Sequence, residues 1–260
     1  MENSKPLSDM PITCLGVSHA TAPLELLERL SITAQGLPGA LEAFKGPLGA
    51  GGARAEVVVL STCNRTEIYL PGTSSPGPGG VFDGLPEELV RWVRDRAGQP
   101  NHRLAASFFR FDGWAAAEHL YNVACGLDSL IVGESQILGQ VAGAYAASQE
   151  AGCAGEVMST VFQSAIRAGR RARAQTGIGR GPTSVSAAAV QRVEELLGGL
   201  GTARVLVLGA GEMGRLVLRR LRDGGTGRID LVNRTFEHAA TAAARWGAVA
   251  HPMAELPVLL

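Results

Sequence analysis

Residues Arg204–Gly214 read R-V-L-V-L-G-A-G-E-M-G, and this stretch decides the fold of the C-terminal part of the chain. The apolar run predicts a buried strand, and three glycines with the spacing G-x-G-x-x-G follow it directly. A helical pattern then continues to Arg222, and a second apolar run covers residues 228–232. Strand, glycine turn, helix and strand in this order are typical of the first half of a dinucleotide-binding Rossmann fold.

The three glycines of this turn suit a bound dinucleotide. Gly209 permits the tight turn, Gly211 lets the backbone approach a pyrophosphate, and Gly214 lets the helix pack closely on the strand. The helix N-terminus adds N–H groups that have no partner within the helix and that attract an anion. The motif therefore predicts a nucleotide cofactor rather than a purely structural turn.

The end of the second strand indicates which cofactor binds. NAD sites place an acidic residue there for the ribose 2′-hydroxyl, whereas this chain has N-R-T at residues 233–235. Asp230 lies three residues earlier, where strand alternation aims it away from the tip. Positive charge and a hydroxyl suit a 2′-phosphate, so we predict NADPH, bound by Gly209, Ala210, Gly211, Glu212, Met213, Gly214, Asn233, Arg234 and Thr235.

Composition excludes several classes of protein. The 260 residues carry 24 basic and 24 acidic side chains, so no global field attracts nucleic acid, and any polyanion must meet a local patch. No stretch approaches the roughly 20 apolar residues of a spanning helix, and the polar first ten residues lack the apolar core of a signal peptide. We therefore expect a globular protein located in the cytoplasm.

The cysteine pattern argues against a metal centre. The four cysteines lie far apart, at positions 14, 63, 125 and 153, without a C-x-x-C pair, which disfavours both a zinc site and a disulfide framework. We expect free thiols in a reducing environment, with Cys14, Cys125 and Cys153 acting as small buried apolar residues.

The remaining patterns predict an α/β chain. Strands are expected at 12–17, 56–60 and 67–70, helices at 23–31, 156–176 and 184–197, and a surface loop at 71–86. Residues 113–149 show helical spacing around a central segment, 126–140, so the middle of the chain should be mostly helical. Glycines and a proline at 176–182 mark a boundary. We predict an N-terminal α+β catalytic domain, residues 1–175, followed by a partial Rossmann-like doubly wound NADP-binding domain, residues 176–260, truncated after room for one more βα unit.

One cysteine differs from the others in its neighbours. Cys63 lies in S-T-C-N-R-T-E, residues 61–67, on a tight connection between two predicted strands. The guanidinium of Arg65 can lower the pKa of a nearby thiol, and the neighbouring hydroxyl and amide groups can bind a carbonyl substrate. Spacing alone leaves a nucleophile and an ordinary cysteine equally well supported.

Three long motifs resemble the glutamyl-tRNA reductases. They are L-G-V-S-H-A-T-A-P at 15–23, S-T-C-N-R-T-E-I-Y at 61–69 and G-L-D-S-L-I-V-G-E-S-Q-I-L-G-Q at 126–140. The similarity continues through T-G-I-G at 176–179, S-V-S at 184–186 and the glycine turn. The resemblance thus spans nearly all of residues 12–235.

The resemblance implies a reaction and its catalytic residues. Cys63 would attack the ester between glutamate and tRNA to form a thioester, which NADPH would reduce to glutamate-1-semialdehyde, the first step of the C5 route to 5-aminolevulinate and tetrapyrroles. A thioester accepts hydride better than an ester does. His119 matches the histidine that assists the carbonyl chemistry, and His19 is a second candidate that sequence does not rank against it.

The resemblance also implies a substrate site. Arg65 would hold the glutamate carboxylate through two hydrogen bonds, and the other expected contacts are Thr62, Asn64, Ser129, Glu134 and Gln140. Either Glu67 or Glu134 could meet the substrate ammonium, or be paired internally.

The expected partners are glutamyl-tRNA and, in the longer family members, a second subunit and the downstream aminomutase. The basic cluster Arg167, Arg170, Arg171, Arg173 and Arg180 is either a phosphate-binding surface or an ordinary solvated helix face. Two alternatives stay open: an NADP-dependent small-molecule dehydrogenase of the shikimate type, and a truncated non-catalytic binding fragment.

Overall fold

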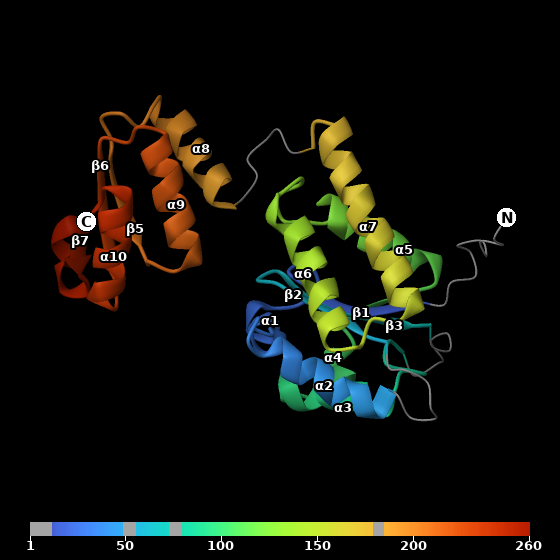
Figure 1. Ribbon diagram of the computed structural model, residues 1–260. Coiled ribbons are helices and arrows are strands. Elements are labelled where there is room, and N and C mark those ends of the chain that lie inside the picture. Colours follow the sequence, from blue (N-terminus) through green and yellow to red (C-terminus); the bar gives the residue numbers. More distant parts are fainter. Residues whose placement is uncertain (1–11, 49–55, 73–79, 179–184) are drawn as a thin grey trace. The chain divides into compact units, whose positions relative to one another are not determined.

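The structure, a computed structural model, describes residues 12–48, 56–72, 80–178 and 185–260. Contacts divide the chain into two compact units, residues 1–179 (unit 1) and residues 180–260 (unit 2), which are described separately (Figure 1). Within the described residues no helix is long and apolar enough to cross a bilayer. Helices and two sheets occur together, as the expected α/β class requires.

Unit 1 is built on a four-stranded sheet in which all neighbouring strands are antiparallel. The order is β2-β3-β1-β4, formed by β1 (Ile12–Ser18), β2 (Val58–Ser61), β3 (Arg65–Pro71) and β4 (Phe109–Asp112). The three predicted strands are confirmed within two residues at each end. The fourth, β4, was not predicted, and it pairs with β1 at an edge of the sheet.

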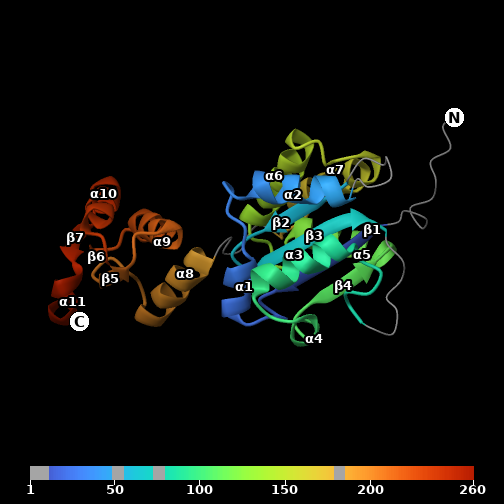
Figure 2. The same cartoon turned by 90° about the horizontal axis from the view of Figure 1, so that it is seen from below.

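Helices cover both faces of this sheet (Figures 1 and 2). One face packs against α5 (Trp114–Cys125), α6 (Gln136–Glu150) and α7 (Glu156–Gln175). The other packs against α1 (Leu24–Leu30), α2 (Leu37–Leu48), α3 (Glu87–Ala97) and α4 (Asn101–Leu104). Alternate residues of β3 supply the two cores, since Tyr69 joins the first and Ile68 and Leu70 join the second. Odd-numbered positions of β3 therefore face α5.

Residues 113–149 are mostly helical, as predicted, but residues 126–135 within them are not. Residues 126–135 form an irregular connection, called here the 126–135 loop, between α5 and α6. Its two glycines have positive φ values, +78° at Gly126 and +84° at Gly133, which a helix does not allow. The apolar side chains Leu127, Leu130 and Val132 of this loop are all exposed.

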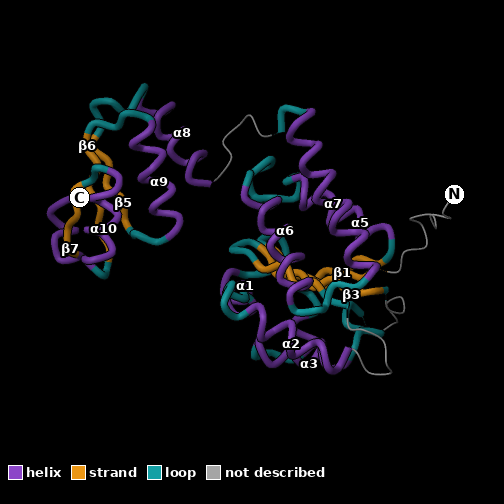
Figure 3. The backbone as a smooth tube through the Cα atoms, viewed as in Figure 1, coloured by secondary structure: helices purple, strands orange, loops and turns teal. Residues whose placement is uncertain are grey.

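Unit 2 contains a parallel sheet with helices beside it (Figure 3). The strand order is β5-β6-β7, from β5 (Arg204–Leu208), β6 (Arg228–Asn233) and β7 (Val249–Pro252). The core is completed by α8 (Val185–Leu197), α9 (Glu212–Asp223) and α10 (Phe236–Trp246), and the short η2 (Met253–Glu255) and α11 (Leu256–Leu259) follow. The predicted strand, glycine turn, helix and strand are confirmed, and α10 with β7 forms one further βα unit.

Candidate active site

The connection between β2 and β3 presents Cys63 at the surface. Thr62 N donates to Arg65 O at 2.8 Å, and Asn64 N donates to the Thr62 hydroxyl at 3.2 Å, so the turn is closed by its own residues. Asn64 O also accepts the backbone N–H of His19 at 2.9 Å. Cys63 is exposed and is not part of a disulfide. The predicted tight connection thus fixes the backbone around an accessible thiol.

Arg65, two residues further on, lies under this turn and is only 2% exposed. Its Nη1 lies 2.6 Å from Glu67 Oε1 and 3.0 Å from Asp128 Oδ2. Nη2 also donates to the backbone oxygen of Asp128. The guanidinium therefore joins strand β3 to the 126–135 loop, a contact between residues 63 positions apart in sequence.

Glu67 stands at the centre of a buried network on the face of β3 that packs against α5. It is 0% exposed, and its two oxygens accept hydrogen bonds from Arg65, from Tyr69 at 2.7 Å and from His119 Nε2 at 2.9 Å. Burial alone would raise the pKa of Glu67, but the hydrogen bond from His119 and the charge of Arg65 outweigh it and leave that pKa below its usual value. Glu67 stays ionised, and no side of it is open to a substrate ammonium.

The same network orients His119. Because Glu67 is an ionised acceptor, Nε2 of His119 carries the proton that forms their hydrogen bond, which leaves Nδ1 as a proton acceptor when the ring is neutral. Nδ1 lies 3.9 Å from Asp128 Oδ2. The rings of Phe109 and Phe111 pack against the imidazole at centroid distances of 5.2 and 4.8 Å. His19, in contrast, is exposed.

Cys14, Glu67 and His119 also place a sulfur, a carboxylate oxygen and an imidazole nitrogen within 4.8 Å of one another. Such a trio can hold a metal ion in other proteins. Here both Glu67 oxygens already accept hydrogen bonds, one of them from a guanidinium, and burial raises the pKa of the Cys14 thiol well above its ordinary value. The arrangement favours a proton network over a metal site.

The 126–135 loop carries two more of the expected substrate contacts, and α6 carries a third. Ser129 Oγ is buried and has no hydrogen-bond partner among the described residues. Glu134 is partly buried, and its backbone oxygen accepts Arg173 Nη2 at 2.5 Å. Gln140 lies in the second turn of α6 and is partly buried.

The basic cluster of α7 divides into inward and outward residues. Arg173 Nη1 donates to the backbone oxygen of Ala124 at 3.1 Å, so this residue ties α7 to the end of α5 and, through Glu134, to the 126–135 loop. Arg180 lies outside the described residues. Arg173 therefore faces inward, whereas Arg167, Arg170 and Arg171 are exposed on α7.

In unit 2 the glycine turn has the geometry that a dinucleotide needs. Gly209 has φ +102°, and a Cβ on Gly214 would lie 1.9 Å from Gly209 O, so neither position tolerates a side chain. Asn233 Oδ1 accepts the backbone N–H of Ala210 at 3.1 Å, and its Nδ2 donates to Thr235 O at 2.8 Å. Asn233 thereby connects the glycine turn after β5 to the end of β6, and these segments together form one rim.

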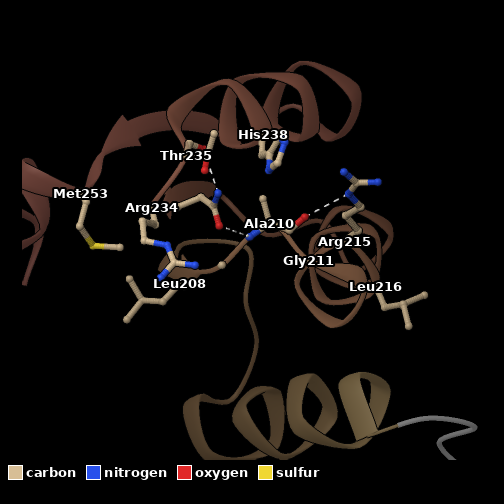
Figure 4. Close-up of a pocket in the computed structure, with 11 residues that line it drawn as sticks. Leu208, Ala210, Gly211, Arg215, Leu216, Arg234, Thr235, His238 and Met253 are labelled. Carbon is tan, nitrogen blue, oxygen red and sulfur yellow. Dashed lines mark hydrogen bonds between the residues drawn. The ribbon is translucent and has the colours of Figure 1, made fainter. Parts of the chain in front are cut away.

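A cavity of about 930 Å³ opens at this rim (Figure 4). Six predicted cofactor residues line it: Gly209, Ala210, Gly211, Asn233, Arg234 and Thr235. Met213 and Gly214 do not line it, and the side chain of Glu212 lies outside what the structure describes. The sequence reasoning missed Leu208, Arg215, Leu216, His238 and Met253, which also line the cavity. His238 could have been found from the sequence, because it follows the N-R-T motif by three residues.

Asp230 takes no part in this cavity. It is 1% exposed and is held by Arg204 at 2.7 Å, Arg228 at 3.1 Å and His251 at 2.8 Å. Burial by itself would raise the pKa of Asp230, but these hydrogen bonds outweigh it and hold that pKa far below its usual range. Its role is in the sheet, away from a cofactor ribose.

Known proteins resemble both units. Residues 15–176 match the family "Glutamyl-tRNAGlu reductase, N-terminal domain", and residues 191–260 match "Shikimate / quinate 5-dehydrogenase". The chain is 43% identical over 252 residues to glutamyl-tRNA reductase from Thermus thermophilus, covering 96% of this chain and 58% of the relative. It is 40% identical over 248 residues to the enzyme of that name from Rubrobacter xylanophilus, covering 95% of this chain and 55% of the relative.

A solved structure agrees with these sequence matches. Glutamyl-tRNA reductase from Methanopyrus kandleri superposes with a TM-score of 0.55 and 34% identity, over 94% of this chain and 55% of that one. The chain therefore spans about half the length of the curated relatives it matches. A reductase match and a dehydrogenase match together imply a nicotinamide cofactor for unit 2. With a family match that covers most of unit 1, the chain belongs to the glutamyl-tRNA reductase family.

Proposed function

We propose that this chain transfers glutamate from glutamyl-tRNA to Cys63 and that the resulting thioester is reduced with NADPH to glutamate-1-semialdehyde. The observation that carries the proposal is the position of Cys63, exposed on a self-closed turn directly before the buried network of Arg65, Glu67 and His119. A nucleophile, a proton acceptor and a cation are thus supplied within one unit.

The first step is an acyl transfer. The Cys63 sulfur forms a bond to the ester carbonyl carbon, the bond to the tRNA ribose oxygen breaks, and that oxygen takes a proton as it leaves. His119 supports this step, because Glu67 fixes its tautomer with Nδ1 as the acceptor for the thiol proton. The buried His119 is in this respect better suited than the exposed His19.

Arg65 is suited to the substrate carboxylate. A guanidinium has five N–H donors. Among the described residues, Arg65 donates three hydrogen bonds through Nη1 and Nη2 to Glu67 and Asp128, which leaves two N–H groups for a further carboxylate. Thr62, Asn64, Ser129, Glu134 and Gln140 are proposed to surround the rest of the glutamyl group. The unpartnered Ser129 hydroxyl supports this arrangement.

NADPH, when bound in unit 2, supplies the hydride for the second step. The residues at the cavity fit this cofactor better than NADH, because the described lining side chains include Arg215, Arg234 and His238 but no carboxylate. Arg234 and Thr235 would hold the 2′-phosphate, and the backbone of the glycine turn would meet the pyrophosphate. Asp230, the nearest acid on β6, is already paired with two arginines and a histidine.

The acyl transfer is tested by incubating the protein with tRNA that carries radiolabelled glutamate and measuring acid-stable label on the protein. Wild type and Cys125→Ser, a control thiol at the end of α5, should both become labelled. Cys63→Ser should lose at least about 10³-fold in labelling rate, as expected for removal of a nucleophile. Equal labelling of Cys63→Ser would overturn the proposal.

Cofactor preference is tested by measuring the affinities for NADPH and NADH. Arg234→Asp should weaken NADPH binding by about 10- to 100-fold, since a hydrogen bond to a charged group contributes about 1.5–3 kcal/mol. NADH binding should change much less. Arg192→Asp, at an exposed arginine of α8 outside the cavity, is the matched control. An unchanged preference in Arg234→Asp would remove Arg234 from this role.

The match of residues 191–260 to a shikimate-type dehydrogenase favours a second candidate, a small-molecule NADP oxidoreductase. That function makes no use of the Cys63 turn. Absence of label on the wild-type protein, combined with NADPH-dependent turnover of a small hydroxy acid, would favour it.

A further inference from the structure

We propose that the carboxylate of Asp128 is the subsite for the α-ammonium group of the substrate glutamate. The inference rests on the proposed function and adds a specificity-determining residue to it. A glutamyl ester has two charged groups, a carboxylate and a primary ammonium, and a site that selects glutamate needs an anion for the second as well as a cation for the first.

Asp128 is the accessible carboxylate of the network. Its Oδ2 lies 3.0 Å from Arg65 Nη1 and 3.9 Å from His119 Nδ1, and its side chain is 50% exposed. Glu67, the other carboxylate on Arg65, is 0% exposed and has both oxygens occupied. Of the two, only Asp128 offers an oxygen to an arriving ligand while it remains next to the proposed carboxylate clamp.

The charges of the network leave room for one more cation. Arg65 carries one positive charge, and Glu67 and Asp128 carry one negative charge each. The exposed end of the network is therefore negative at Asp128. An ammonium at this end would be attracted to the exposed charge of Asp128.

A neighbouring hydroxyl supplies an independent observation. Ser129 Oγ follows Asp128 in the loop, is buried and has no hydrogen-bond partner among the described residues. An unpaired buried hydroxyl costs free energy unless a ligand or a water satisfies it. An ammonium has three donors, so Asp128 and Ser129 together could accept two of its hydrogen bonds.

The loop is held in place before any substrate arrives. Gly133 N donates to Gly126 O at 2.8 Å and closes the loop at its base. A Cβ on Gly133 would lie 1.8 Å from Ile178 O, so the loop is also packed tightly against the end of α7. Arg173 adds hydrogen bonds to both ends, as described above. Because the loop already holds the Asp128 carboxylate in place, little binding free energy is lost in ordering that side chain when a ligand binds.

The rival for this role is Glu134. Its backbone oxygen is fixed by Arg173, and it makes no ion pair with Arg65 or His119 among the described residues. Glu134→Gln therefore tests this rival: it removes a carboxylate from the same loop without removing the one on Arg65.

The experiment compares two acylated tRNAs, one carrying glutamate and one carrying 2-hydroxyglutarate, in which a hydroxyl of similar size replaces the ammonium. The measured quantity is the second-order rate of thioester formation on Cys63 without NADPH. For wild type, loss of the ammonium should lower this rate by about 10- to 100-fold, the range for a hydrogen bond between charged groups. Asp128→Asn should react slowly with both tRNAs and at nearly equal rates.

The ratio of the two rates separates recognition from a general disturbance. A purely structural effect of Asp128→Asn would slow both substrates equally and keep the wild-type ratio, and that result would overturn the inference. Glu134→Gln should keep the wild-type ratio; a ratio near one in Glu134→Gln would assign the ammonium to Glu134 instead. Asp128→Glu, which keeps the charge, should restore part of the discrimination.

Failure of the inference differs from failure of the proposed function. If wild type forms the thioester equally fast from both tRNAs, the function stands and the Asp128 subsite is wrong. If wild type forms no thioester from glutamyl-tRNA, both are wrong.

Discussion

Among the residues that the structure describes, each unit has one fully buried carboxylate paired with arginine and histidine, yet the two carboxylates have different surroundings. Glu67 in unit 1 is held by Arg65 and His119, whose side chains are 2% and 11% exposed. Asp230 in unit 2 is held by two arginines that are 54% and 53% exposed, and by His251. The same residue types therefore form a buried network in one unit and a network open to water in the other.

The difference shows what each carboxylate does. The partners of Asp230 come from β5, β6 and β7, one strand after another, so Asp230 ties the three strands of the sheet together. The partners of Glu67 include the groups proposed to touch the substrate, so we expect Glu67 to act through them as a positioning residue. We therefore expect the same pairing chemistry to hold strands together in unit 2 and to position the proposed reactive groups in unit 1.

The largest effect is expected for Glu67→Gln. Removing the charge leaves Arg65 with one carboxylate instead of two and replaces the ionised acceptor of His119 by a neutral amide, and breaking a buried pair costs about 3–5 kcal/mol. Hydrogen exchange of the β3 amides, read by mass spectrometry, should report this loss, and labelling of Cys63 should slow. Tyr69→Phe, which removes one hydrogen bond to the same carboxylate, should cost only about 1 kcal/mol. Similar exchange in Glu67→Gln and wild type would mean that the buried network contributes nothing.

A smaller effect is expected for Asp230→Asn, because water can solvate the exposed arginines once the charge is gone. We expect a loss of about 1–2 kcal/mol in the stability of unit 2 at neutral pH and unchanged labelling of Cys63. The pKa of Asp230 is lowered in the folded state, so its contribution is present above the unfolded value near 4 and is lost as the pH falls through the native value. The difference between wild type and Asp230→Asn should therefore disappear in strong acid. Slower Cys63 labelling in this variant would contradict the structural role.

The smallest effect is expected for His251→Gln. Hydrogen bonds to Glu255 and Asp230 raise the pKa of His251, so its contribution is fully present below the unfolded value near 6.5 and is lost as the pH rises through the native value. With Glu255 half-exposed, we expect less than about 1 kcal/mol. Denaturant unfolding of unit 2, followed through Trp246, should show a difference between wild type and variant at pH 6 that vanishes above pH 9. A difference that grows with pH would have the wrong sign.

The two sites also differ in how far the sequence predicted them. The rim of the cofactor cavity comes from one local motif, and six of the nine residues expected there line the cavity. His238 and Met253 were missed because they reach the rim only when α10 and the segment after β7 fold back beside it. In unit 1 the turn around Cys63 was recognised, but the pairing of Arg65 with Asp128 was not, since 63 residues separate them.

The sequence pattern did not specify the conformation of the segment between α5 and α6. Two glycines at positive φ make residues 126–135 the loop that holds Asp128 and Ser129. The four residues of β4 gave too short a pattern to predict a strand, and that strand exists because the β1 edge pairs with it.

The sequence by itself determined the features that depend on neighbouring residues: the strand, glycine turn and helix of unit 2, the N-R-T end of its second strand, and the tight turn that exposes Cys63. Backbone conformations of this kind are fixed by local sterics, so short motifs are sufficient to specify them. Only the tertiary structure decided that Glu67 is inaccessible, that Asp128 is the open carboxylate on Arg65 and that Arg173 faces inward. These outcomes depend on which distant segments pack against β3 and α7, because burial and pairing set the charge and accessibility of a side chain.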